Sequence, residues 1–309
     1  MKLAEIGKKI SELRREMNLT QGELAQGICT QALISLIEKG ELDPNATILY
    51  QISKKLGVDV NYFFAISSTP RLDYITEVER QLRDLRILLR YEDMMEIVET
   101  EEKNPLFYQD PSKLQYLYWH KSIYSMEVEK DYEQATSLLE KAFTLVPKSK
   151  RAYTEQELEM LLTQGVFEET IENYEEAIFY YKKVESIVTE TNRMLTDPTI
   201  KSRYFYNLAR VYTHLGKLEE SIDLLTSGIE WGVECGELYI MAEFHYQVSY
   251  NFELQNNYEK ALEYLMYSIQ LFELNPDYPY KEFLSEKKST YLQIVKKLDY
   301  TGNQKNSNG

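Results

Sequence analysis

A degenerate repeat runs through the last three-quarters of the chain. Five positions, separated by 41, 42, 44 and 40 residues, each stand three residues before a small or flexible one: Tyr91, Tyr132, Tyr174, Leu218 and Tyr258. The partner residues are Met94, Ala135, Ala177, Ser221 and Ala261, and an apolar stripe at helical spacing follows each pair. A period of this length predicts stacked pairs of antiparallel helices, in which the second helix packs back on the first. Because no convincing strand alternation accompanies it, we predict an all-α chain.

The best-formed repeat unit lies between residues 205 and 228. Its characteristic residues are Phe205, Tyr206, Asn207, Leu208, Ala209, Tyr212, Gly216, Leu218, Ser221, Leu225 and Gly228. This unit resembles the tetratricopeptide (TPR) repeat, with longer helices than the usual 34-residue unit. The resemblance implies a right-handed TPR-like solenoid of about five helical pairs, closed by a terminal helix from Pro279 to Leu298. One unit departs from the pattern, because Glu168 occupies a position that is usually aromatic. The alternative is a plain helical bundle.

A second pattern lies near the N-terminus, in residues 20 to 40. Thr20 followed by Glu23 predicts a capping box at the start of a short helix, and Gly27 provides the left-handed residue at which that helix ends. Thr30 can cap a second helix, whose apolar residues recur at helical spacing. Two short helices around a glycine-containing turn are typical of a helix-turn-helix, whose second helix enters the DNA major groove. An ordinary helical hairpin is the alternative.

Helical patterns on both sides support the DNA-binding interpretation. Ile6, Ile10 and Leu13 indicate a helix before the motif, and Asn45 to Leu56 and Val60 to Phe64 indicate two after it. Residues 1–66 resemble the five-helix lambda-repressor/Cro (XRE-type) DNA-binding domain. The matching residues are Leu13-Arg14, Leu19-Thr20-Gln21, Leu24-Ala25, Gln31, Ile34-Ser35, Ile37-Glu38-Lys39-Gly40, Pro44, Leu49, Ile52 and Leu56-Gly57.

The predicted second helix leaves polar and small side chains on its outer face. A glutamine can pair bidentately with adenine, a serine can donate or accept, and an alanine can touch the thymine methyl group. The predicted DNA-binding residues are Thr20, Gln21, Thr30, Gln31, Ala32, Ser35, Lys39 and Arg14.

Charge is distributed unevenly along the chain, whose net charge is −15. Residues 1–66 hold eight basic and eight acidic residues, so the remainder holds 35−8 = 27 basic and 50−8 = 42 acidic ones. DNA binding must therefore depend on a local basic patch rather than on a global positive field. The candidates for that patch are Lys8, Lys9, Arg14, Arg15, Lys39, Lys54 and Lys55.

A composition break separates the two patterns. Ser67 to Thr69 precede Pro70, which disfavours helix in the residue before it. We predict a DNA-binding domain at 1–66, a linker at 67–71, a repeat domain at 72–300 and a frayed tail at 301–309. The N-terminus lacks the apolar stretch of a signal peptide, and no run approaches the roughly 18 apolar residues of a membrane span. We therefore expect a cytoplasmic protein that does not enter membranes.

No constellation for catalysis or metal binding is visible in the sequence. Cys29 and Cys235 lie far apart, and the three histidines (His120, His214 and His245) lack ligand spacing. Acidic pairs such as Glu168-Glu169 are interpreted as solvated helix faces. We predict no enzymatic activity, no catalytic residues, no metal and no cofactor.

The repeats offer a candidate binding groove instead. First helices of successive repeats line the concave face of a solenoid, which suits an extended peptide. An asparagine there can satisfy both a backbone donor and a backbone acceptor of the peptide, and an arginine can bind a carboxylate. The predicted peptide-binding residues are Asn207, Arg203, Arg210, Tyr206, Tyr246, Gln247, Tyr250 and Lys121.

The combination of both halves resembles the peptide-pheromone-responsive transcriptional regulators of Gram-positive bacteria, the group of PlcR, PrgX, NprR and Rgg. The resemblance covers nearly the whole chain. It implies a homodimer that binds a palindromic operator in double-stranded DNA and whose activity is set by a short signalling peptide, as in quorum sensing. The alternative is a regulator whose repeats serve only dimerisation or protein-partner binding, without a peptide ligand.

Overall fold

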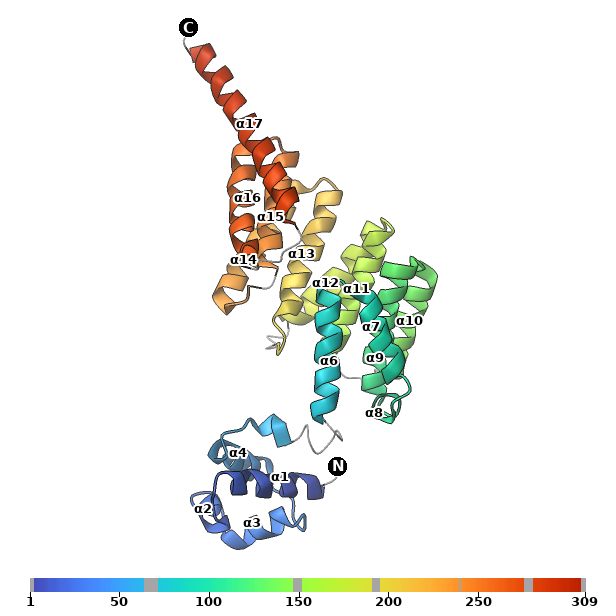
Figure 1. Cartoon of the computed structure of the whole chain (residues 1–309), viewed down its shortest axis with the longest axis vertical. Helices are drawn as coiled ribbons and strands as arrows, with labels where there is room; N and C mark the ends of the chain where they lie inside the picture. Colours follow the sequence, from blue (N-terminus) through green and yellow to red (C-terminus); the bar gives the residue numbers. More distant parts are fainter. Residues whose placement is uncertain are drawn as a thin grey trace. The chain divides into compact units, whose positions relative to one another are not determined.

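The chain forms two compact units, residues 1–113 and 114–309, which are described separately. The computed structural model describes residues 3–63, 72–146, 152–190, 195–238, 240–274 and 280–306. All regular structure in these ranges is helical, which confirms the predicted all-α class (Figure 1). The predicted linker at 67–71 and the last three residues of the predicted tail lie outside the described residues.

The first unit begins with the predicted helix-turn-helix domain. Its helices are α1 (Leu3–Glu16), α2 (Gln21–Ala25), α3 (Gln31–Glu38) and α4 (Ala46–Lys55), and residues 60–63 are also helical. Thr20 and Glu23 form the predicted capping box, and Thr30 caps α3 by accepting a hydrogen bond from the backbone of Leu33. Gly27 has φ of +80°, as the predicted helix end requires. The remaining helices of this unit are α6 (Leu72–Ile87), α7 (Tyr91–Glu101) and α8 (Pro105–Tyr108).

One glycine allows the first helix to approach the third closely. A Cβ atom on Gly7 would collide with the backbone carbonyl oxygen of Ile37 and would lie 3.2 Å from Cα of Glu38. Because backbone atoms cannot swing away, only glycine fits this contact between α1 and α3. The side chains of Ile6, Ile10, Ile34 and others then close a small core beneath α3.

The second unit contains the remaining helices, and its first helix crosses the unit boundary. They are α9 (Pro111–Tyr124), the π-helical turn η1 (Ser125–Glu129), α10 (Tyr132–Leu145), α11 (Glu155–Thr170), α12 (Tyr174–Glu190), α13 (Thr199–His214), α14 (Leu218–Cys235), α15 (Met241–Leu254), α16 (Tyr258–Phe272) and α17 (Lys281–Asn306). Successive helices pack as pairs, α11 with α12, α13 with α14, and α15 with α16, and α17 then covers α16 (Figure 1).

The predicted repeat is confirmed residue by residue. Each of the five marker positions is the first residue of a second helix, namely of α7, α10, α12, α14 and α16. The five partner residues are completely buried: Met94, Ala135, Ala177, Ser221 and Ala261. The repeated residue pair therefore marks the place where each second helix packs closely on its neighbours.

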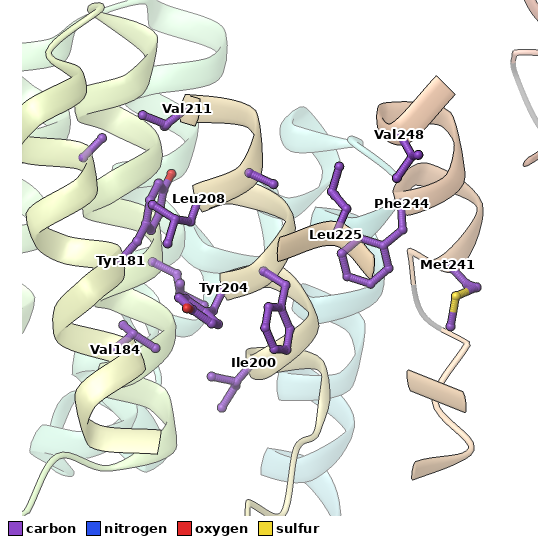
Figure 2. Close-up of a cluster of buried hydrophobic side chains, with 14 of the residues drawn as sticks. Tyr181, Val184, Ile200, Tyr204, Leu208, Val211, Leu225, Met241, Phe244 and Val248 are labelled. Atoms are coloured by element: carbon purple, nitrogen blue, oxygen red, sulfur yellow. The ribbon is translucent and has the colours of Figure 1, made fainter. Parts of the chain in front are cut away.

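A continuous apolar core joins the repeats of the second unit. Figure 2 shows part of it, with side chains of α12, α13, α14 and α15 that point toward one another: Tyr181, Val184, Ile200, Tyr204, Leu208, Val211, Leu225, Met241, Phe244 and Val248. First helices of successive repeats also touch directly, α11 with α13 and α13 with α15, as expected for helices that line one side of a solenoid.

Two sequence-based expectations differ from the structure. Glu168 and Glu169 are each 6% exposed, so their interpretation as a solvated face was wrong. They lie on α11, which is buried nearly all round because α12 and α13 both pack on it. In addition, α17 continues to Asn306, beyond the predicted end of the repeat domain at residue 300. Across the described residues no helix combines the length and apolar character that crossing a membrane requires.

Candidate functional site

The outer face of α3 carries the residues predicted to read DNA bases. Gln31, Ala32 and Lys39 are exposed and Ser35 is half-exposed, whereas Ile34 and Ile37 on the opposite face are buried. Thr20 and Thr30 are exposed at the N-terminal ends of α2 and α3, where helix ends suit phosphate contacts. Leu36, 37% exposed, is an additional apolar residue of this helix that the sequence pattern did not single out.

Arg14 is a correction to the predicted DNA-binding set. It is 8% exposed, its Nε donates to Glu38 at 2.6 Å, and its Nη1 donates to the carbonyl oxygen of Leu19 at 2.7 Å. Gln21 and Ser11 donate to the same carboxylate, at 2.9 and 3.0 Å. Burial opposes the charge of Glu38, but these hydrogen bonds outweigh it and hold the pKa of Glu38 below its usual value. Arg14 and Gln21 therefore fix α3 within the domain, and we leave Arg14 out of the DNA-binding surface.

The remaining basic candidates divide into paired and unpaired side chains. Lys9 forms an ion pair with Glu12 at 3.2 Å, and Lys55 donates to the carbonyl oxygen of Gln26 at 2.8 Å. Lys8, Arg15, Lys39 and Lys54 are exposed, and no hydrogen bond or ion pair holds them among the described residues. These four are the cations best placed to meet phosphates.

The predicted peptide-binding residues of α13 lie on one stripe of that helix. Arg203, Tyr206, Asn207 and Arg210 follow one another at helical spacing, and we call them the α13 stripe. Arg203 and Arg210 contact α11 through ion pairs, whereas the ring of Tyr206 lies 6.1 Å from that of Phe244 on α15. The stripe therefore lies between the first helices of the preceding and the following repeat.

Asn207 is the polar group of the stripe that makes no hydrogen bond within the described structure. The residue as a whole is 8% exposed, and its amide forms no hydrogen bond with any residue that the structure describes. Its amide atoms are not among the fully buried polar atoms that lack a partner, so they reach solvent and are open to a ligand. One amide can satisfy both a donor and an acceptor of a peptide backbone.

Both arginines of the stripe have carboxylate partners on α11 that sequence reasoning missed. Arg203 pairs with Glu159, and Arg210 pairs with Glu169 through Nη2 and Oε1 at 2.8 Å. Tyr181 also donates to Glu169, at 3.2 Å. Burial raises the pKa of Glu169. The partners could not be inferred from spacing, because more than 40 residues separate each pair.

The predicted aromatic residues of α15 contact the chain itself. The ammonium group of Lys287 on α17 lies 5.7 Å from the ring of Tyr246 and 5.2 Å from that of Tyr250, and it pairs with Glu253 at 2.7 Å. Gln247 is 7% exposed and donates to the hydroxyl of Thr213 at 3.0 Å. These contacts hold α15 to α17 and to α13, so we leave Tyr246, Tyr250 and Gln247 out of the proposed peptide site.

Two further polar residues of the repeats are Lys121, which was predicted to bind peptide, and Glu243, which was not. Lys121 lies half-buried on α9, in a different repeat from α13 and α15. Glu243, in the first turn of α15, was not predicted; burial raises the pKa of its carboxyl group, and no ion pair involves it within the described ranges. Its charge contributes to the raised pKa of Tyr206, which burial, as the main cause, brings to about 12.

The first unit has two open hollows, of about 310 and 390 Å³, between α6 and α7. Their linings include the acidic residues Glu77, Asp84, Asp93 and Glu96. Among the described residues, no group of histidine, cysteine, aspartate and glutamate side chains could hold a metal ion.

Comparison with known proteins agrees with this architecture. The chain is similar in fold to *Bacillus thuringiensis* PlcR in complex with the peptide PapR7 and DNA, at 20% identity and a TM-score of 0.82 over 91% of this chain and 99% of that one. It is also similar to ComR from *S. thermophilus* in complex with DNA and its signalling peptide ComS (14%, 0.56, 93% and 99%). The third similar structure is the *Streptococcus dysgalactiae* SHP pheromone receptor Rgg2 (17%, 0.55, 95% and 99%). No curated protein sequence matches the chain.

Family assignment follows from two matches along the sequence. Residues 10–63 match a helix-turn-helix family, in agreement with α1 to α4. Residues 81–293, which are more than half of the chain, match the C-terminal domain of the RNPP family. The chain therefore belongs to the RNPP family.

Proposed function

We propose that this protein is a sequence-specific DNA-binding transcriptional regulator whose TPR-like domain binds a short signalling peptide that modulates operator binding. The observation that carries the proposal is that the chain combines an exposed polar face on α3 with Asn207, on the first helix of a repeat, whose solvent-accessible amide has no hydrogen-bond partner among the described residues. The PlcR and ComR structures, which share the fold, contain both DNA and a peptide. The protein acts by binding, in the cytoplasm, and not by catalysis.

DNA recognition is assigned to α3 and its surroundings. Gln31, Ala32 and Ser35 read base edges in the major groove, and Lys39 with the threonine caps of α2 and α3 contacts the phosphates. A homodimer presents two such helices to a palindromic operator, with the half-sites about 34 Å apart or a multiple of that distance.

Peptide recognition is assigned to the α13 stripe. Asn207 donates to and accepts from the peptide backbone, so it recognises an extended chain whatever its side chains. Tyr206 supplies an apolar ring beside it, and an arginine receives a carboxylate. Because the peptide bridges first helices of neighbouring repeats, it favours one curvature of the solenoid over another. A ligand can shift a conformational equilibrium only through such a difference in affinity.

The test compares Asn207→Ala with the unchanged protein. Operator sequences are first selected from random double-stranded DNA, and operator affinity is then measured with and without a pool of synthetic heptapeptides. We expect the pool to change the affinity for the unchanged protein and to have no effect on Asn207→Ala, whose helical content stays the same. Gln270→Ala, which removes an exposed amide on α16, is the matched control and keeps the response.

The possible results separate the two functions considered. If no heptapeptide alters the affinity or thermal stability of the unchanged protein, the repeats serve dimerisation or protein-partner binding instead. A ligand that binds only the folded state must raise the apparent stability, so thermal shift detects binding even where DNA affinity stays constant. A full peptide response in Asn207→Ala would contradict the clamp assignment.

A further inference from the structure

The two ion pairs between α11 and α13 differ in how they face solvent. In the first pair both side chains are largely buried, with Arg203 15% and Glu159 8% exposed. In the second pair the carboxylate is 4% exposed, whereas the Arg210 side chain is 38% exposed. The first pair is thus internal. The second presents a cation at the surface while its counter-ion stays inside.

Arg210 retains unused hydrogen-bond donors. A guanidinium group has five N–H donors in a planar fork, and the ion pair to Glu169 accounts for the only acceptor that Arg210 has within the described part of the chain. Its guanidinium carbon lies 5.7 Å from the ring centre of Tyr206, which supports one side of the group. Arg210 also follows Asn207 by three residues, on the same helical stripe. The fork is therefore held in place with free donors beside the proposed backbone clamp.

Glu169 lies in a small cluster of ionisable groups. From α13 it faces Arg210 at 2.8 Å and His214 Nε2 at 3.8 Å, with Tyr206 nearby. From α12, Tyr181 donates to it at 3.2 Å, and Tyr174 stacks on His214 with ring centres 5.5 Å apart. The adjacent Glu168 on α11 accepts from Tyr132 of α10 at 2.9 Å. Within the described ranges, Arg210 is therefore the one permanently charged cation that contacts the Glu169 carboxylate.

A second carboxylate bound to Arg210 would disturb the balance between the positive charge of Arg210 and the negative charge of Glu169. The guanidinium can bridge two carboxylates, but its single charge then has to offset two negative charges, one of them buried. Water cannot screen a buried charge well, and burial already raises the pKa of Glu169. A proton taken up by Glu169 restores the charge balance with the least rearrangement.

We propose that Arg210 is the receptor for a carboxylate of the peptide, that Glu169 is the positioning residue that aims it, and that binding takes up a proton at Glu169. This inference rests on the proposed peptide-binding function. It assigns Arg203 a structural role, although the sequence pattern treated the two arginines alike. It also predicts that peptide affinity rises as the pH falls from 8 to 6, because a process that takes up protons is favoured at low pH.

The first experiment uses three libraries of random synthetic heptapeptides. One has a free C-terminal carboxylate and lacks aspartate and glutamate; the second is C-terminally amidated and contains them; the third is amidated and lacks them. Peptides retained by the full-length protein are identified by mass spectrometry. We expect retention from the first or the second library, which identifies the source of the carboxylate, and about 10- to 100-fold weaker binding from the third, as a charged hydrogen bond implies. In Arg210→Gln this preference disappears, while peptides are still retained weakly.

The second experiment measures how many protons are taken up when the peptide binds. Binding heats for the best retained peptide are recorded near pH 7 in buffers of different ionisation enthalpy. We expect proton uptake by the unchanged protein and none by Glu169→Gln. Arg210→Gln provides a second variant should Glu169→Gln fold poorly; because it removes the carboxylate receptor, we expect it to abolish the uptake.

The outcomes distinguish this inference from the function on which it rests. Equal retention from all three libraries, or binding without proton uptake by the unchanged protein, would overturn the inference and leave the peptide-binding function standing. No retention from any library would overturn both. Retention of the carboxylate preference in Arg210→Gln would assign the receptor to another residue and would also overturn it.

Discussion

At the scale of single residues, the charge of a side chain says little about its task until its partner is known, as Arg14 shows. It is a basic residue in a DNA-binding domain, yet it is buried against Glu38 together with Gln21 and Ser11. Because the pKa of Glu38 is held below its usual value, its charge stabilises the folded state at pH values above the unfolded-state pKa of about 4.3. That contribution is lost as the pH falls through the lower, folded-state pKa.

This network gives a pH-dependent prediction. We expect Glu38→Gln to destabilise the helix-turn-helix domain by about 3 kcal/mol at pH 7, since it removes one partner of a buried ion pair. The difference from the unchanged protein should shrink as the pH falls from about 4.3 through the lower folded-state pKa of Glu38, below which the carboxyl group is neutral in both states. Hydrogen exchange of the α1 and α3 backbone amides measures this difference in stability. A difference that stays constant between pH 7 and pH 3 would show that the charge of Glu38 is not the cause.

Gln31 and Lys39 should respond differently to truncation. If Gln31 reads a base bidentately, Gln31→Ala loses about 1–3 kcal/mol against the preferred operator and accepts substitutions at that base pair. Lys39→Ala should weaken binding to all sequences alike and reduce the slope of log affinity against log salt by about 1. Binding titrations on an operator series at several salt concentrations separate the two effects. A sequence-dependent loss in Lys39→Ala would contradict its assignment to phosphate.

At the scale of helices, local sequence patterns were sufficient to predict where helices begin. They were not sufficient to predict the partners of the residues in the proposed peptide site. The five second helices begin at the residues that the repeat pattern marks, because a large residue followed by a small one describes a packing point within one unit. The α3 cap was equally local. The partners of Arg203 and Arg210 were not visible, because ion pairs between repeats depend on how units stack and not on spacing within one unit. The contact of Lys287 with Tyr246 and Tyr250 was missed for the same reason.

The close approach of α1 and α3 gives a prediction for an element. We expect Gly7→Ala to destabilise the helix-turn-helix domain by about 1–3 kcal/mol, because the added methyl group meets the backbone of Ile37. Gly22→Ala is the matched control. Its nearest neighbours would be 3.8 and 3.9 Å away, so alanine should stabilise α2 by about 0.5–1 kcal/mol through its higher helix propensity. Denaturation followed by hydrogen exchange in α3 compares the two, and equal effects would refute the steric explanation.

At the scale of the whole molecule, the proposed function requires that peptide binding to the repeat domain affects DNA binding by the helix-turn-helix domain. The two domains differ in net charge. Residues 1–66 are neutral and the rest of the chain carries the entire charge of −15, so the repeat domain itself repels DNA. The repeat domain therefore adds nothing to the electrostatic attraction for the operator. We propose a geometric route for the peptide response, in which a change in solenoid curvature alters the distance between the two recognition helices of a dimer.

Such a mechanism depends on half-site spacing, which gives the last prediction. Operators with half-sites moved apart or together in single base-pair steps should each show their own response to a peptide retained from the heptapeptide libraries. If the peptide changes the distance between recognition helices, it must favour some spacings and disfavour others, and the preferred spacing must shift when it is added. If it acts only by stabilising the dimer, affinity rises by the same factor at every spacing. Gel-shift titrations across the series distinguish a moving preference from a uniform gain, and a uniform gain would exclude the geometric route.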